Sequence, residues 1–169
     1  MTGPTHEQSR VADTVERVLG ELDVAWQRRD RHVFGVTLPG TRKLKTECAL
    51  EVGRHTLDVR AFVARNPEAN HAAVHRWLLE RNLRLPLVAF TVDHHGDIHL
   101  CGRLPLSAVT DDVVDAVLGT VAEAADDSFN TILELGFADS IRAEWAWRRS
   151  RGESTANLAA FSHLDPGPS

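Results

Sequence analysis

Two neighbouring segments of the chain alternate apolar and polar residues with a period of two, and this alternation limits what the chain can fold into. In residues 43–52 the even positions hold Leu, Thr, Cys, Leu and Val, whereas most of the odd positions are charged. In residues 57–63 the odd positions are all apolar. Strict alternation predicts strands with one buried face, and the short link through Gly53-Arg54 requires antiparallel pairing, because parallel strands need a long crossover. The two segments therefore predict an antiparallel β-hairpin with one apolar face.

Further segments supply the rest of a sheet and the helices that cover it. Residues 33–38 alternate and end at the turn Pro39-Gly40, while 87–93 and 98–104 predict two strands around a turn at 94–97. Residues 28–31 are interpreted as a polar connection. Helices are predicted over 7–23, over 139–150, and from the N-cap Asn66 to Asn82 with Pro67 as the first helical residue. A long helix is predicted after Thr110, with a possible break near 126–128, and residues 157–164 are predicted to form a short last turn or helix.

The order of these elements is a helix, three strands, a helix, two strands and further helices. An antiparallel sheet with one apolar face needs helices on that face. We therefore predict a two-layer α+β fold, with a five-stranded antiparallel sheet (α-β-β-β-α-β-β-α order) covered by helices on one face. A chain of 169 residues buries roughly 70% of its unfolded surface, enough for one core without disulfides or metal. A single domain is expected over residues 7–164, with disordered tails at 1–6 and 165–169.

Charge and the lengths of the apolar runs exclude several classes of protein. The chain has 24 acidic and 19 basic side chains, and its formal charge of -5 argues against a general nucleic-acid binder. No apolar run reaches the ~18–20 residues of a membrane span, and the N-terminus lacks the pattern of a signal peptide. Cys48 and Cys101 are too few for a disulfide framework and are interpreted as reduced thiols. These features predict a cytoplasmic protein without nucleic-acid or membrane partners.

No pattern of catalytic or metal-binding residues stands out. Phosphate-binding glycine loops and nucleophile motifs are absent from the sequence, and the His71/His75 pair lacks the glutamate of the HExxH zinc motif. His99 and Cys101 share a strand face, but residues two apart lie about 7 Å from each other, too far for a nucleophile and its base. Asp126-Asp127 is interpreted as a pair of capping or solvated acids. We therefore predict a non-enzymatic protein without a cofactor, metal or catalytic residue.

The outward face of the predicted sheet carries mixed charges around one exposed aromatic residue, Phe62. Cross-strand ion pairs on a solvated sheet explain such charges equally well. The alternative is a recognition surface, because a fixed charge pattern around an apolar side chain suits the binding of a protein segment. On that hypothesis the partner-binding residues are Arg42, Lys43, Lys45, Arg60, Phe62 and Arg103. A second hypothesis is a small-molecule or thiol-stress sensor, with a pocket between sheet and helices that uses His99, Cys101 and Arg103.

Four segments of the chain are similar to the actinobacterial YbjN-domain proteins. They are LPGTRKLKT at 38–46, FVARNPE at 62–68, WLLERN at 77–82 and FNTILELGF at 129–137, and the similarity extends from about residue 12 to 164. YbjN-domain proteins are described as bacterial sensory transduction regulators, and their fold is similar to that of type III secretion chaperones. The resemblance implies a chaperone-like α+β domain without enzymatic activity that forms homodimers and binds a protein segment or regulatory partner. The family has no established catalytic residues, so none are transferred to this chain.

Overall fold

The structure, a computed structural model, describes residues 5–168 and is built on an antiparallel sheet. The sheet has six strands in the order β1-β2-β3-β4-β6-β5, and each neighbouring pair is antiparallel. The strands are β1 (Ala25–Asp30), β2 (Val33–Pro39), β3 (Lys45–Val52), β4 (Thr56–Ala64), β5 (Ala89–Val92) and β6 (Ile98–Pro105). The predicted hairpin of β3 and β4 is confirmed and lies in the middle of the sheet.

The prediction of five strands is wrong, because residues 28–31 were interpreted as a connection. Arg28 and its neighbours belong to β1, which pairs with β2 from Ala25 opposite Thr37 to Asp30 opposite Val33. β1 is an edge strand, and within it only Trp26 is partly buried. An edge strand with so little buried surface shows no apolar alternation, so the sequence pattern gives no sign of it.

The predicted separation of the two sheet faces is confirmed. Phe34, Val36, Leu50, Val59 and Leu100 are each no more than 2% exposed and form the core under the helices. The opposite face carries charged residues of β3, β4 and β6, namely Glu47, Glu51, Asp58, Arg60 and Arg103. This arrangement leaves one face of the sheet free of helices.

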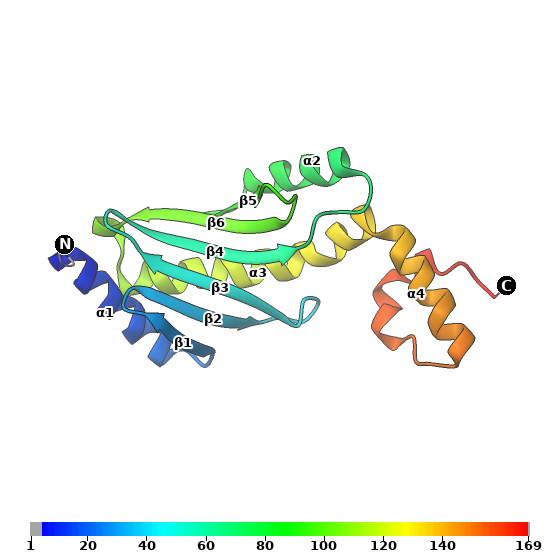
Figure 1. The fold of residues 1–169 in the computed structure, drawn as a ribbon, viewed down its shortest axis with the longest axis horizontal. Coiled ribbons are helices and arrows are strands. Elements are labelled where there is room, and N and C mark those ends of the chain that lie inside the picture. The colour runs from blue at the N-terminus through cyan, green and yellow to red at the C-terminus, as the bar shows by residue number, and fades with distance from the viewer. Residues whose placement is uncertain (1–4, 169) are drawn as a thin grey trace.

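Helices α1 (His6–Glu21), α2 (His71–Asn82) and α3 (Asp111–Gly136) supply the second layer, and a short 3-10 helix η1 (Leu106–Ala108) precedes α3. Figure 1 shows α3 running along the length of the sheet and continuing past its end. The helix has no break near 126–128, because its buried stripe continues from Val114 through Ala125 and Ser128 to Ile132. In α1, Thr5 and Gln8 form a reciprocal capping box at the first turn.

The predicted helix start with Asn66 as its cap is also wrong, since the cap of α2 is Asn70, four residues later. The intervening residues instead close the C-terminal end of α3: the amides of Glu68 and Ala69 donate to the Gly136 carbonyl at 2.9 and 3.2 Å. Pro67 lies so close that a Cβ on Gly136 would come within 2.8 Å of the proline ring. These bonds satisfy a carbonyl that the last turn of a helix leaves unpaired. Residues 66–69 therefore cap the C-terminal end of α3 and do not begin α2, although their sequence is typical of a helix start.

Helix α4 (Ala138–Arg151) and the 3-10 segment η2 (Ala156–Leu164) form a unit beyond the end of the sheet (Figure 1). Its small core consists of Ile141, Trp145, Leu158 and Phe161, and Leu133 of α3 packs against it. Of the tails expected at 1–6 and 165–169, residues 1–4 and 169 lie outside the described range. Thr5 and His6 belong to the start of α1, and Asp165 accepts a hydrogen bond from Arg149 at 2.5 Å. Within residues 5–168 no helix combines the length and apolar character that crossing a membrane requires.

Candidate binding groove

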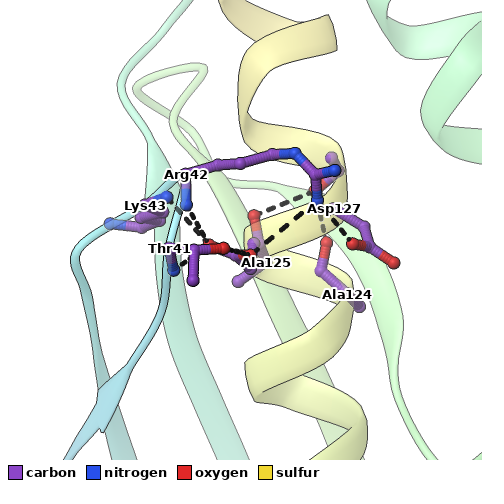
Figure 2. Close-up of polar contacts among 8 residues, drawn as sticks. Thr41, Arg42, Lys43, Ala124, Ala125 and Asp127 are labelled. Atoms are coloured by element: carbon purple, nitrogen blue, oxygen red, sulfur yellow. Dashed lines mark hydrogen bonds and ion pairs between the residues drawn. The ribbon is translucent and has the colours of Figure 1, made fainter. Parts of the chain in front are cut away.

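The β2–β3 loop binds the middle of α3 through one carboxylate. The backbone amides of Thr41, Arg42 and Lys43 donate to Oδ1 of Asp126 at 2.8, 2.7 and 2.9 Å, and the Thr41 hydroxyl donates to Oδ2 at 2.8 Å (Figure 2). We call this arrangement of Thr41–Lys43 on Asp126 the clasp. Four donors on one carboxylate fix the loop on the helix, because hydrogen bonds to a charged acceptor are stronger than neutral ones.

Gly40 makes this close approach of loop and helix possible. A Cβ at this position would lie 2.2 Å from the carbonyl oxygen of Lys43 and 2.7 Å from the Asp126 carboxylate. The Gly40 amide also donates to the Leu44 carbonyl at 3.1 Å, which closes the turn. The Pro-Gly-Thr-Arg-Lys sequence can therefore form a tight loop around the carboxylate because Gly40 has no side chain.

The clasp stabilises the ionised form of Asp126. Partial burial alone would raise the pKa of this carboxyl group. The donors from Lys43, the Thr41 hydroxyl, Arg42 and the Thr41 amide outweigh that effect and lower the pKa below its usual value. Asp126 is therefore a charged acceptor at neutral pH.

The clasp forms one wall of a groove with a volume of about 750 Å³. The groove lies between the end of β4, the C-terminal half of α3, and the α4–η2 unit. Its apolar lining comes from all of these elements and includes Phe62, Phe129, Leu133, Phe137, Ile141 and Leu158. Its rim carries Arg42, Lys43 and Arg65 on the clasp and β4 side, and Glu144 on α4. Such a groove accommodates a large apolar side chain beside a charged rim.

The structure divides the six predicted partner-binding residues into two groups. Arg42, Lys43 and Phe62 line the groove, and Phe62 does so from the open face, where it packs against His99. Lys45, Arg60 and Arg103 lie on the open face outside the groove. Lys43 was expected on that open face, but its ammonium lies over the ring of Phe129 in α3. The predicted alternation fails at Leu44, which was expected inside and is 81% exposed. The reason is the clasp: residues 41–44 follow Asp126 rather than the strand, which begins at Lys45.

Charges on the open face form ion pairs, as one of the two interpretations proposed, and the pair Arg103–Asp58 joins two neighbouring strands. Arg103 donates to Asp58 at 2.9 Å, Arg60 lies 3.6 Å from Asp93, and Lys45 lies 3.9 Å from Glu47. These pairs neutralise much of the face. The groove is therefore the stronger candidate for a binding site.

His99 and Cys101 also lie on the open face, so they do not line a space between sheet and helices. His99 is 8% exposed, its Nε2 lies 3.0 Å from Asp93, and Phe62 packs against it edge-on with ring centres 5.5 Å apart. Burial acts to raise the pKa of Asp93, but bonds from His99 and from two turn amides lower it to about 2. Cys101 accepts a hydrogen bond from the Thr91 hydroxyl at 3.2 Å. In the part of the chain that is described, no cluster of three potential metal ligands occurs.

The residues that sequence reasoning missed are Asp126 and the α4–η2 wall of the groove. Asp126 lies in the interior of α3 and is neither a cap nor a freely solvated acid. Its partners are more than 80 residues away in sequence, so no local pattern reveals them. Ile141 and Leu158 were predicted to be helical, but nothing in the sequence predicted that they would face the end of β4.

Comparison with known proteins agrees with this architecture. The family model described as "Putative bacterial sensory transduction regulator", YbjN, matches residues 12–134. The chain belongs to the YbjN family. An uncharacterized protein of Mycobacterium tuberculosis is 50% identical over 162 residues, which cover 90% of this chain and 88% of the relative. An uncharacterized protein of Mycobacterium leprae is 55% identical over 129 residues, 76% of this chain and 70% of the relative.

Two solved structures resemble this YbjN protein to different degrees. A chain in the crystal structure of the ExsC–ExsE complex has a TM-score of 0.55 at 17% identity, covering 74% of this chain and 95% of that one. The Yersinia pestis type III secretion chaperone SycH, in complex with a fragment of YscM2, has a TM-score of 0.47 at 15% identity and 70% coverage of this chain and 96% of that one. At this identity, the first likeness supports a common fold of antiparallel sheet and helices.

Proposed function

We propose that the chain binds a segment of another protein in the groove between the clasp, the end of β4 and the α4–η2 unit. The observation that carries this proposal is an apolar groove of about 750 Å³ that opens beside the exposed ring of Phe62. Apolar surface rimmed by charge is typical of interaction sites on soluble proteins. The likeness to a chain that is part of a protein complex, ExsC–ExsE, supports the same proposal.

We propose binding, rather than catalysis, as the activity. Burial raises the pKa of the Cys48 thiol to about 12, so this sulfur is not a nucleophile at neutral pH. His99 is held between Asp93 and Phe62 on the open face and is not among the residues that line the groove. The groove itself is lined mainly by aromatic and aliphatic side chains. These features favour recognition of a protein segment without a chemical step.

The test uses the full chain to select peptides from a displayed random library. Phe62→Ser removes an apolar side chain of the groove that is 42% exposed, and Val92→Ser removes one of β5 outside the groove that is 43% exposed. Selected peptides should bind at least about tenfold more weakly to Phe62→Ser, because buried aromatic anchors dominate such interfaces. Val92→Ser should bind like the unaltered protein. Equal affinity of both variants, or no selected peptide at all, would overturn the proposal.

We further propose that the chain forms a homodimer in the cytoplasm. Leu79 of α2 and Leu83, which caps the C-terminal end of that helix, are 66% and 87% exposed and lie four residues apart, so they are neighbours on the surface. A second copy would remove this apolar surface from water. Sedimentation equilibrium should give a dimer. Leu83→Glu should convert it to a monomer, whereas Leu44→Glu, which changes another exposed leucine, should leave it a dimer.

The proposed location in the cytoplasm is supported by the two cysteines, which are both free, as is typical of a reducing compartment.

A further inference from the structure

Three cations stand at the rim of the groove, and one of them differs from the others. Arg42 is 2.9 Å from a carboxylate oxygen of Asp127, and Arg65 is 2.7 Å from one of Glu68. The Lys43 ammonium has no carboxylate oxygen within 4 Å among residues 5–168, and the one hydrogen bond it makes there is to the carbonyl of Lys45, at 3.0 Å. Lys43 is therefore the rim cation that still lacks an anionic partner.

The surroundings of Lys43 increase its attraction for an anion. Its ammonium lies 5.3 Å from the ring centre of Phe129, which lines the groove, and the residue is partly buried. Burial lowers the pKa of the amine, more than Glu47 raises it. A charge beside apolar surface is less screened by water than one on an open surface, so a carboxylate placed against it is bound more strongly.

The backbone of Lys43 is fixed, so its side chain starts from a defined position. Its amide donates to Asp126 in the clasp, and its ammonium donates to the Lys45 carbonyl and lies over the ring of Phe129. A fixed cation of this kind recognises a partner at a small entropic cost. The clasp thus determines where a negative charge is accepted.

The rim charges also give the groove a direction. The three cations lie on the clasp and β4 side, and Glu144 lies opposite on α4, where it pairs with Arg148 at 2.5 Å. Glu144 is paired with Arg148, whereas the Lys43 ammonium has no carboxylate partner among residues 5–168, so a bound carboxylate is attracted to the clasp side of the groove. The apolar residues Ile141, Leu158 and Phe161 line the α4–η2 side.

We propose that the groove binds an acidic–apolar protein segment. The side-chain carboxylate of an Asp or Glu residue pairs with Lys43, and a large apolar side chain next to it enters between Phe62, Phe129 and Leu158. This inference rests on the proposed function and names the chemistry of its partner. It makes Lys43 the residue that sets specificity, whereas the apolar lining supplies affinity.

The test selects peptides separately on the unaltered protein, on Lys43→Glu and on Lys45→Glu. The unaltered protein should enrich Asp or Glu beside Phe, Leu, Ile, Met or Trp. Lys43→Glu should enrich Lys or Arg at the same position. Lys45→Glu changes a charge on the open face of the sheet and should select the same peptides as the unaltered protein.

A second measurement needs no variant of the protein. Replacing the acidic residue of a selected peptide by its amide, Glu to Gln, should weaken its binding to the unaltered protein about tenfold at low salt and by less at high salt. The same replacement should have no effect on binding to Lys43→Gln. The loss of the Glu-to-Gln effect in this variant would connect the carboxylate to the Lys43 ammonium.

The outcomes separate this inference from the proposed function. The acidic–apolar segment would be overturned if the selected peptides need Phe62 but show no preference for an acidic residue. It would also be overturned if Lys43→Glu selects peptides with the same acidic preference as the unaltered protein. In both cases the groove would remain a binding site. Selected peptides whose affinity is insensitive to Phe62→Ser would overturn both. An unchanged Glu-to-Gln effect in Lys43→Gln would also contradict the role of Lys43.

Discussion

The backbone amide of Lys43 donates a hydrogen bond of 2.9 Å to the carboxylate of Asp126, although 83 residues separate them in sequence. Through this bond and those of Thr41 and Arg42, the end of the β2–β3 hairpin is attached to the middle of α3. The clasp has two consequences. It holds the sheet and the longest helix together at the end where the groove opens, and it positions two of the cations at the rim.

Asp126→Asn should lower the free energy of unfolding by about 1–3 kcal/mol, because three backbone amides and a hydroxyl exchange a charged acceptor for a neutral one. The matched control is Asp127→Asn, since among residues 5–168 the Asp127 side chain pairs only with the exposed Arg42 side chain. We expect the control to cost less than about 1 kcal/mol. Urea unfolding followed by circular dichroism measures both, and equal losses would contradict the role given to the clasp.

Stability should fall with acid between about pH 4 and pH 2. The pKa of Asp126 is lower in the folded chain than in the unfolded one, and that of Asp93 is lowered to about 2. A carboxyl group with a lowered pKa stabilises the fold above its unfolded value of about 3.9 and stops doing so as the pH falls through its folded value. Melting temperatures from pH 7 to 2 measure this effect. In Asp126→Asn the melting temperature should fall less steeply below about pH 4 than in the unaltered protein. An equally steep fall in both proteins would contradict the account.

Gly40→Ala should destabilise the fold by more than about 1 kcal/mol, because its Cβ would lie 2.2 Å from the Lys43 carbonyl and against Asp126. Gly119→Ala is the control: it lies inside α3, and its Cβ would meet nothing within 4 Å. Alanine is favoured over glycine in a helix by about 1 kcal/mol, so this variant should be more stable. Thermal unfolding of the two variants should therefore shift in opposite directions, and a shift of both in the same direction would refute the close approach at Gly40.

The two cysteines should differ in reactivity. Burial raises the pKa of the Cys48 thiol to about 12, and its side chain lies in the core, whereas Cys101 is partly exposed. Iodoacetamide at pH 8 should therefore modify Cys101 in the native protein and Cys48 only after unfolding. Mass spectrometry of the digested protein identifies the modified residue. Alkylation of Cys48 in the native protein would show that β3 is not packed against the core as described.

Period-two alternation predicted β2, β3, β4 and β6 and the side of the sheet on which each residue lies, because burial of one face imposes that pattern. It could not predict β1, whose edge position buries only part of Trp26. It also placed Lys43 and Leu44 on the wrong sides, because the carboxylate of Asp126 determines the path of the chain there. Three of the six predicted partner-binding residues line the groove, but the groove depends on how α4 and η2 lie against β4, which no local pattern encodes.

The central claim is that a partner segment lies in the groove and not on the open face of the sheet. Nuclear magnetic resonance of the labelled full chain, titrated with a peptide selected by that chain, tests it most directly. The account predicts that the amide signals of Lys43, Phe129 and Leu158 shift on binding, while those of Cys101 and Arg103 on the open face remain in place. Shifts confined to Cys101 and Arg103 would contradict the claim.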